Sequence, residues 1–241
     1  MALPKIDIPT YELDLPVSKK HIKFRPFLVK EQRNLLMAIE SSDAKSVHQS
    51  VRDILVNCTL TENIVIDELP VIDVEYYFVQ LRGKSVGEIV ESRYKCNNIV
   101  EEKECNNIME KDIDLTKINV EMPEGIESEI KITDKITVKL KYPQFSVVKD
   151  SLDYEDINEV TFMMVADSIE YIYDGEQFYY AKETSKQELI QWVESLNQDQ
   201  FNKIEVFFNN LPKLKETIKM TCGKCGFNHT IEVEGLESFF G

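Results

Sequence analysis

The cysteines are the residues of this chain whose types and spacing most clearly predict chemistry. Cys222 and Cys225 form a C-x-x-C pair, and a glycine follows each of them directly. Glycine lets the backbone turn tightly enough for both sulfur atoms to face one ion, so this spacing is typical of a zinc knuckle. Two thiolates do not complete a tetrahedral site, and Cys96 and Cys105 are the candidate second pair. We therefore predict one structural Zn²⁺ per chain, held by these four cysteines.

The sequence leaves two alternatives to zinc open, which are unliganded thiols and a disulfide. The eight residues between Cys96 and Cys105 are an unusual spacing for half of a zinc site. In a reducing cytosol, however, clustered cysteines are metal ligands more often than disulfides. A site with four sulfur ligands has no open position for water, so the predicted site is structural rather than catalytic.

Two other side chains could have belonged to the metal site. His229 could replace one of the cysteines, but a four-sulfur site leaves it no role, and we expect it on the surface of a strand. Cys58 has no neighbouring cysteine and falls on the apolar face of a predicted helix, so we expect it in the core.

A short repeat surrounds the first cysteine pair. Residues 96–99 (CNNI) recur as residues 105–108, nine positions later. On one helix the two copies would lie on opposite faces and could not share a ligand. On the two arms of a β-hairpin, with residues 100–104 at its tip, the two sulfur atoms can converge. The repeat therefore predicts a hairpin.

Sequence signatures of catalysis are missing from the chain. It has no G-x-x-x-x-G-K-[ST], no G-x-G-x-x-G and no G-x-S-x-G, and its three histidines are scattered. The acidic stretch at residues 150–159 lacks the central glycine of a calcium loop, and we expect it to be the charged first turn of a helix. We predict that the protein is not an enzyme.

The charge of the chain limits its partners. Its 28 basic and 43 acidic residues give a net charge of −15, which opposes binding to a phosphate backbone. Residues 1–15 do not resemble a signal peptide, and no apolar stretch approaches the roughly 20 residues of a membrane span. We expect a cytosolic protein that binds neither nucleic acid nor membrane.

The elements that must position the cysteines follow from hydrophobic spacing and turn signals. Strands at 11–15 and 21–25 predict an N-terminal hairpin, followed by helices at 27–40, from Asp43 to 58, and at 73–82 with its end near Gly83 and Gly87. A β-rich stretch comes next. Its strands are expected at 87–96, 105–114, 117–122, 129–133 and 136–142.

The last third of the chain returns to helical spacing. A helix is expected from residue 156 to the turn at Asp174, and then a strand at 177–181. Ser185 and Glu188 form a capping box for the next helix, and the aromatic stripe at 201–211 predicts another. Strands at 214–221 and 229–233 flank the C-x-x-C pair. The fold class is α+β, with helical groups around a β-rich module, a four-cysteine staple joining mid-chain to the C-terminal hairpin, and segments 1–86, 87–145 and 146–241.

Three stretches of the chain carry a resemblance to a known family. They are residues 1–32, which include MALPK, YEL and RPFLVKEQ, residues 81–88 (LRGKSVGE), and residues 222–240, which include CGKCG and IEVEGLESFF. In combination they resemble the baseplate hub and hub-assembly proteins of T4-like tailed bacteriophages. The resemblance spans nearly the whole chain.

The resemblance implies a non-enzymatic role in forming the hub of a contractile-tail baseplate, with other baseplate hub and tail proteins as partners. An assembly factor acting in the host cytoplasm is the first hypothesis, and a hub subunit retained in the virion is the second. A zinc-ribbon regulator that binds nucleic acid is a remote third, opposed by the net charge. The end motifs suggest a set of partner contacts, although large apolar side chains among them could equally fill the core. These candidates are Arg25, Phe27, Leu28, Leu236, Phe239 and Phe240.

Overall fold

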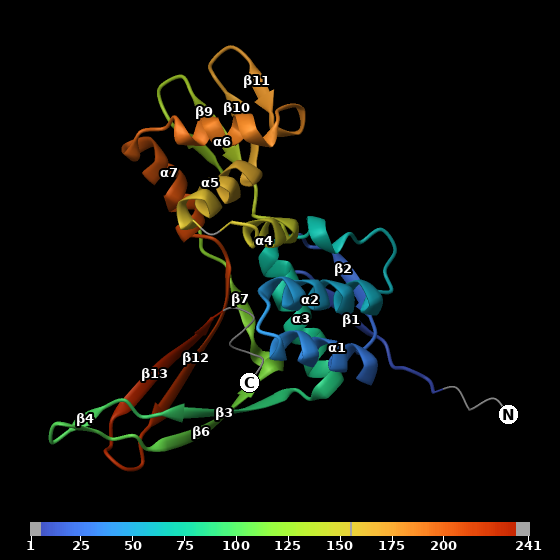
Figure 1. Cartoon of the computed structure of the whole chain (residues 1–241), viewed down its shortest axis with the longest axis vertical. Helices are drawn as coiled ribbons and strands as arrows, with labels where there is room; N and C mark the ends of the chain where they lie inside the picture. The colour runs from blue at the N-terminus through green and yellow to red at the C-terminus, as the bar shows by residue number, and fades with distance from the viewer. Residues whose placement is uncertain (1–5, 155, 235–241) are drawn as a thin grey trace.

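The computed structural model describes residues 6–154 and 156–234. The α+β fold class is confirmed, since this part of the chain forms seven α-helices and five small antiparallel sheets. Figure 1 shows three regions: a helical group in the middle, a sheet lobe above it, and an extended β-spur below it. The C-x-x-C turn and the repeat with the first cysteine pair lie in the β-spur.

The helical group begins with the predicted hairpin and the first two predicted helices, which are confirmed. The Asp43 carboxylate accepts hydrogen bonds from the backbone N–H groups of Lys45 and Ser46, as an N-cap should. Cys58 is fully buried in the core of this group, as expected. The elements are β1 (Tyr11–Asp14), β2 (His21–Phe24), α1 (Val29–Glu40), α2 (Ala44–Cys58), a 3-10 turn (Ile66–Glu68), α3 (Val71–Val86) and α4 (Phe145–Ser151).

Helix α3 connects the regions, and it is longer than the sequence predicts. It continues through Gly83 and ends at Gly87, whose φ of 145° is a conformation that favours glycine. One side of α3 packs in the core of the helical group, while Ile72 and Val79 pack with the base of the β-spur. A helix buried on both sides lacks the polar stripe that would mark its ends in the sequence.

A buried carboxylate fixes the N-terminal hairpin to α3. Asp73 is 0% exposed, and its two oxygens accept hydrogen bonds from the backbone N–H groups of Val17 (2.8 Å) and Ser18 (2.7 Å). These two donors lie in the turn between β1 and β2. The turn is thereby held against the helix by side-chain hydrogen bonds rather than by apolar contact alone.

The sheet lobe contains a four-stranded sheet with the strand order β11-β10-β9-β8, and three helices cover it. The helix expected from residue 156 to the turn at Asp174 is wrong in its second half, because the chain changes from helix to strand at Ile169. Ile169 and Ile172 are both buried in the strand although they are three positions apart, because the register of β10 with β9 shifts between Ile169 and Tyr171. The elements are β8 (Glu129–Lys131), β9 (Thr137–Leu140), α5 (Ile157–Ser168), β10 (Ile169–Tyr173), β11 (Phe178–Tyr180), a 3-10 turn (Ala181–Glu183), α6 (Lys186–Glu194) and α7 (Gln198–Asn209).

The β-spur consists of two long antiparallel hairpins and a short strand. One hairpin is β3 (Ile89–Lys95) with β6 (Ile108–Asp114), and it narrows to the small pair β4 (Ile99–Val100) and β5 (Lys103–Glu104). A 3-10 turn (Leu115–Lys117) then leads to β7 (Asn119–Glu121). The other hairpin is β12 (Lys213–Thr221) with β13 (Asn228–Glu234), and β7 pairs with the start of β12.

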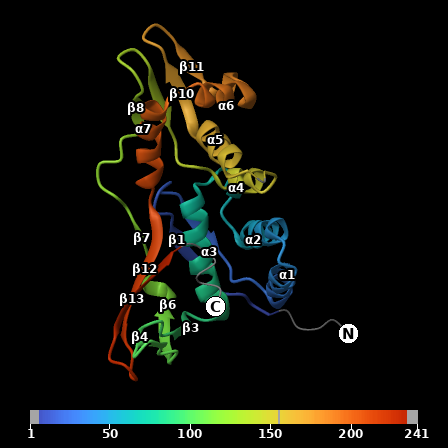
Figure 2. The ribbon, with the colours of Figure 1, turned by 60° about the vertical axis from the view of Figure 1, so that its left-hand side comes forward.

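The buried clusters combine parts of the chain that are far apart in sequence. The sheet lobe joins β8 and β9 with the helices after residue 156, and the base of the β-spur joins α3, β3 and β6 with β12 and β13. Figure 2 shows the hairpin β3–β6 beside the hairpin β12–β13 in the β-spur. Among the described helices, none is long and apolar enough to cross a membrane.

Candidate metal centre

Each hairpin of the β-spur brings two cysteines to the far end. Cys96 follows β3 directly and Cys105 follows β5, while Cys222 follows β12 and Cys225 lies in the turn before β13. The predicted hairpin for the CNNI repeat is confirmed. Its two-residue tip, residues 101–102, has φ values of 48° and 64°, as a tight hairpin turn requires.

Backbone hydrogen bonds hold the two copies of the repeat against each other. The N–H of Cys96 donates to the carbonyl of Asn107 (2.8 Å), and the N–H of Cys105 donates to the carbonyl of Asn98 (2.8 Å). The N–H of Asn106 donates back to the carbonyl of Cys96 (3.0 Å). This reciprocal pairing places each cysteine at an equivalent position on its own arm, so the repeat has a structural cause.

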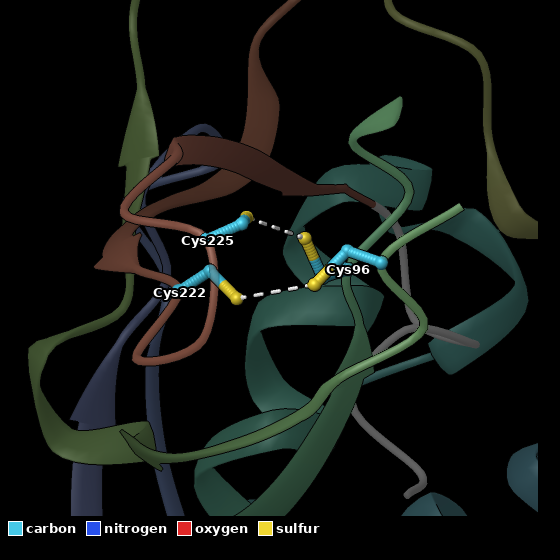
Figure 3. A group of neighbouring side chains, drawn as sticks. Cys96, Cys222 and Cys225 are labelled. Carbon is cyan, nitrogen blue, oxygen red and sulfur yellow. Dashed lines mark hydrogen bonds between the residues drawn. The ribbon is translucent and has the colours of Figure 1, made fainter. Parts of the chain in front are cut away.

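The four sulfur atoms converge on one point. The Sγ atoms of Cys96 and Cys225 are 3.7 Å apart, those of Cys105 and Cys222 are 3.8 Å apart, and all four lie within 4.8 Å of one another (Figure 3). Zinc–sulfur bonds of about 2.3 Å in a tetrahedron place neighbouring sulfur atoms about 3.8 Å apart. The arrangement therefore has the size of a four-coordinate thiolate site, and these cysteines could bind a metal ion.

None of the four cysteines forms a disulfide. A disulfide requires a sulfur–sulfur distance of about 2.05 Å, well below the closest approach here. Cys96, Cys105 and Cys222 are buried, and Cys225 is half-buried. Four thiolates this close and this buried would repel one another, and a cation between them would supply the charge that stabilises them.

The cysteine pKa values differ between the two hairpins, because backbone hydrogen bonds act on one pair and burial acts on Cys96 of the other. The backbone N–H of Cys225 donates to the sulfur of Cys222 and lowers the pKa of Cys222 to about 6. The N–H of Phe227 lowers the pKa of Cys225 in the same way. Burial instead raises the pKa of Cys96 to about 12. The C-x-x-C turn therefore favours thiolates, whereas Cys96 on the other hairpin would lose its proton on binding a cation.

Side-chain N–H groups surround the sulfur atoms, and the sequence analysis missed them. The amide of Asn98 donates to Sγ of Cys225 (3.6 Å), and the amide of Asn107 donates to Sγ of Cys222 (3.5 Å). Each asparagine lies two residues after a cysteine of its own hairpin and reaches a cysteine of the other. The doubled C-x-N spacing was the available signal for this role.

The expectation for His229 is wrong. This residue is only 9% exposed, and its Nε2 atom lies 3.2 Å from Sγ of Cys96. Its ring also contacts the ring of Phe227 edge-on, with centroids 4.8 Å apart. The alternation of β13 points His229 toward the other hairpin rather than to solvent. With the proton on Nε2, the ring donates a hydrogen bond to the sulfur of Cys96 and offsets its negative charge.

Replacing His229 with alanine should weaken metal binding without removing a ligand. We expect the affinity for Zn²⁺ to fall roughly 10- to 100-fold, the usual effect of losing a group that hydrogen-bonds to a metal ligand. Competition with a chromophoric chelator measures this change. The matched control is His21→Ala, since His21 is exposed and pairs with Asp14 far from the site. Equal affinities in both variants would show that the contact between His229 and Cys96 has no influence on the metal.

The end of the β-spur has little else to hold it together. Its buried cluster is Cys96, Cys105, Cys222 and Met109, with the partly buried Tyr94, Met220 and Cys225 packed against it. Apolar side chains nearby remain exposed instead of filling a core. They are Ile99 (68%), Val100 (44%), Ile108 (57%) and Phe227 (45%). A small structure with so few buried apolar groups requires a crosslink, and a bound metal ion would provide one.

Comparison with known proteins identifies the family of the chain. The family described as T4 bacteriophage base plate protein matches residues 8–241, which is nearly the whole sequence. The chain belongs to this family. No curated protein and no solved structure matches it. The four cysteines of this base plate protein all lie within the matched residues.

The candidate partner contacts that the structure describes, Arg25, Phe27 and Leu28, lie at the start of the helical group, apart from the metal centre. Phe27 is 7% exposed and packs in the core of the helical group, so the core alternative holds for this side chain. Arg25 is half-buried and forms an ion pair with Glu31 (2.8 Å), and Leu28 is the half-buried N-cap of α1. Leu236, Phe239 and Phe240 lie outside the described residues.

The ion pair of Arg25 has a structural role at the start of α1. Burial alone would raise the pKa of Glu31, but the hydrogen bonds from Arg25 and from the N–H of Leu28 hold that pKa below its ordinary value. The Glu31 carboxylate therefore links the end of β2 to the first turn of the helix. Partner contact through Arg25 or Leu28 stays a prediction.

Proposed function

We propose that this base plate protein is a non-enzymatic factor in the assembly of the baseplate hub, with one structural Zn²⁺ bound by its four cysteines. The observation that carries the proposal is the match of a phage base plate family to residues 8–241. Four sulfur ligands at tetrahedral distances favour zinc, and they leave no coordination position for a substrate or a water molecule.

The shape of the molecule supports a role in protein contacts. The β-spur extends away from the helical group (Figure 1). Four apolar side chains of its outer part are exposed, Ile99, Val100, Ile108 and Phe227. Apolar groups gathered at the end of a projection are a common feature of protein–protein contact sites. The zinc ion would keep this end rigid, so that the contact surface is formed before a partner arrives.

An assembly factor fits the charge of the chain better than a permanent subunit. A net charge of −15 keeps free protein soluble and opposes association before the correct partner is present. A subunit committed to permanent interfaces would bury larger apolar surfaces. The second candidate, a hub subunit retained in the virion, is favoured by the same exposed end of the β-spur.

Affinity capture from infected cells tests the proposal. The tagged chain is captured during infection, its partners are identified by mass spectrometry, and purified mature particles are analysed in parallel for the chain itself. The assembly role predicts that the chain copurifies with hub proteins in the lysate and is missing from particles. The untagged chain from a parallel infection is the control for proteins that bind the matrix.

Two other results of the same experiment would change the conclusion. Hub proteins in the capture together with the chain in mature particles would make it a structural subunit. Capture of polymerase or nucleic acid in place of tail proteins would contradict both hub hypotheses and support the zinc-ribbon regulator.

A further inference from the structure

Helix α1 has a stripe of exposed side chains, three of them apolar, that the other described residues leave uncovered. Its buried side packs Glu31, Leu35 and Ala38 against the helical group. On the opposite side, Val29 is 81% exposed, Leu36 51% and Met37 56%. Figure 2 shows α1 at the outer side of the helical group, with α2 above it and α3 to its left. Folding alone does not account for apolar side chains on this outer face.

The exposed stripe follows the spacing of a helix–helix contact. Successive members are separated by three, one, three, one and three residues, so they form one continuous face of the helix. They also line a shallow groove on the surface. The stripe consists of Val29, Gln32, Arg33, Leu36, Met37 and Glu40.

The charges on the stripe are arranged so that they can pair with the opposite charges of a second copy of the chain. Arg33 and Glu40 are both exposed, and neither side chain forms an ion pair with another residue of the described ranges. They lie at equal distances on either side of the Leu36–Met37 step. A two-fold axis through that step, with the helices antiparallel, places Arg33 of each copy opposite Glu40 of the other.

We propose that α1 is a dimerisation surface and that its occupant is α1 of a second copy of this chain, packed antiparallel. Leu36 and Met37 of the two copies form the apolar centre, and two reciprocal Arg33–Glu40 pairs flank it. A parallel arrangement would instead place Arg33 against Arg33 and Glu40 against Glu40, which is repulsive. The antiparallel arrangement also aligns the two helix dipoles favourably.

The contact is small, so the dimer should be weak. A helix of 12 residues is about 18 Å long, and a pair of such helices buries less surface than a standard stable interface. We expect the monomer and the dimer to exchange at micromolar concentrations. The proposed contact does not depend on zinc binding, because α1 and the metal centre are in different regions of the molecule.

Charge reversal tests the pairing directly. Sedimentation of the full-length, metal-loaded chain over a concentration series should show a monomer–dimer equilibrium for the unmodified protein. Arg33→Glu alone and Glu40→Arg alone should each weaken self-association at least tenfold, because each brings like charges together. An equimolar mixture of these two variants should associate again, since it restores opposite charges in both pairs. The double variant R33E/E40R should also associate.

The controls separate this contact from general effects of charge and folding. Lys111→Glu changes an exposed charge on β6 of the β-spur, away from α1, and should leave the equilibrium unchanged. Leu36→Glu should abolish the dimer, and circular dichroism should show the same helix content in every variant. A chain that is monomeric at all concentrations overturns the proposal. So does a dimer that the single reversals leave intact, and neither result bears on hub assembly or on zinc.

Discussion

Changing both Cys222 and Cys225 to serine should remove the metal and lower the free energy of unfolding by several kcal/mol. The two remaining thiols cannot hold the ion, and the end of the β-spur then loses the centre of its buried cluster. Because 1 kcal/mol corresponds to about 2–4 °C in a chain of this size, Tm should fall by roughly 10 °C. Metal content by atomic emission and melting by calorimetry measure the two effects on the same samples.

The matched control for this variant is Cys58→Ser, which alters a buried cysteine of the helical group without touching the metal centre. It should reduce stability and leave the metal content unchanged. The addition of a strong chelator should lower Tm of the unmodified chain and leave that of the double serine variant unchanged. Unchanged melting, with metal absent from both proteins, would refute the zinc prediction.

The Asp73→Ala variant should be destabilised by about 3 kcal/mol. The backbone N–H groups of Val17 and Ser18, both half-buried residues, would lose their buried charged acceptor, and a donor left without a partner costs about 1–3 kcal/mol when it is fully buried. The hairpin β1–β2 should detach first, because these bonds fix its turn to α3. Chemical denaturation gives the stability, and hydrogen exchange of the amides in β1 and β2 gives the location.

Two further variants check that the effect belongs to these bonds. Asp73→Asn keeps one acceptor oxygen and should lie between the original chain and the alanine variant. Asp53→Ala removes an exposed carboxylate from α2 and should change the stability by less than about 0.5 kcal/mol, as surface substitutions usually do. If Asp73→Ala unfolds at the same denaturant concentration as Asp53→Ala, the hydrogen bonds to the turn do not stabilise the fold.

Local signals predicted the parts of this molecule that local physics determines. The N-cap at Asp43 and the capping box of Ser185 with Glu188 are both present, because they depend on residues within one turn of helix. The convergence of the four cysteines was also predictable, since metal-ligand spacing and a repeat pointed to two hairpins. The caps and each cysteine pair contain their groups within a few residues, whereas the meeting of the two pairs, 117 to 129 positions apart, was predicted from the four ligands that zinc requires.

Long-range contacts explain what the sequence did not reveal. Ile169 and Ile172, three positions apart, have helical spacing, and both are buried in the strand only because its register with β9 shifts between Ile169 and Tyr171. His229 reaches Cys96 across 133 positions of the sequence, so nothing near His229 indicates its partner. Asp73 is ordinary for the first turn of a helix, and only the packing of α3 against the β1–β2 turn makes it a buried acceptor.

Native mass spectrometry of the full-length chain, purified without added metal or chelator, tests the central claim most directly. The four-cysteine site predicts a single species that carries one Zn²⁺, and mild acid should convert it to the metal-free mass as the thiolates become protonated. The same sample should carry no metal when Cys222 and Cys225 are serine. A folded chain that has its metal-free mass at neutral pH, with all four thiols free to react, would contradict the account.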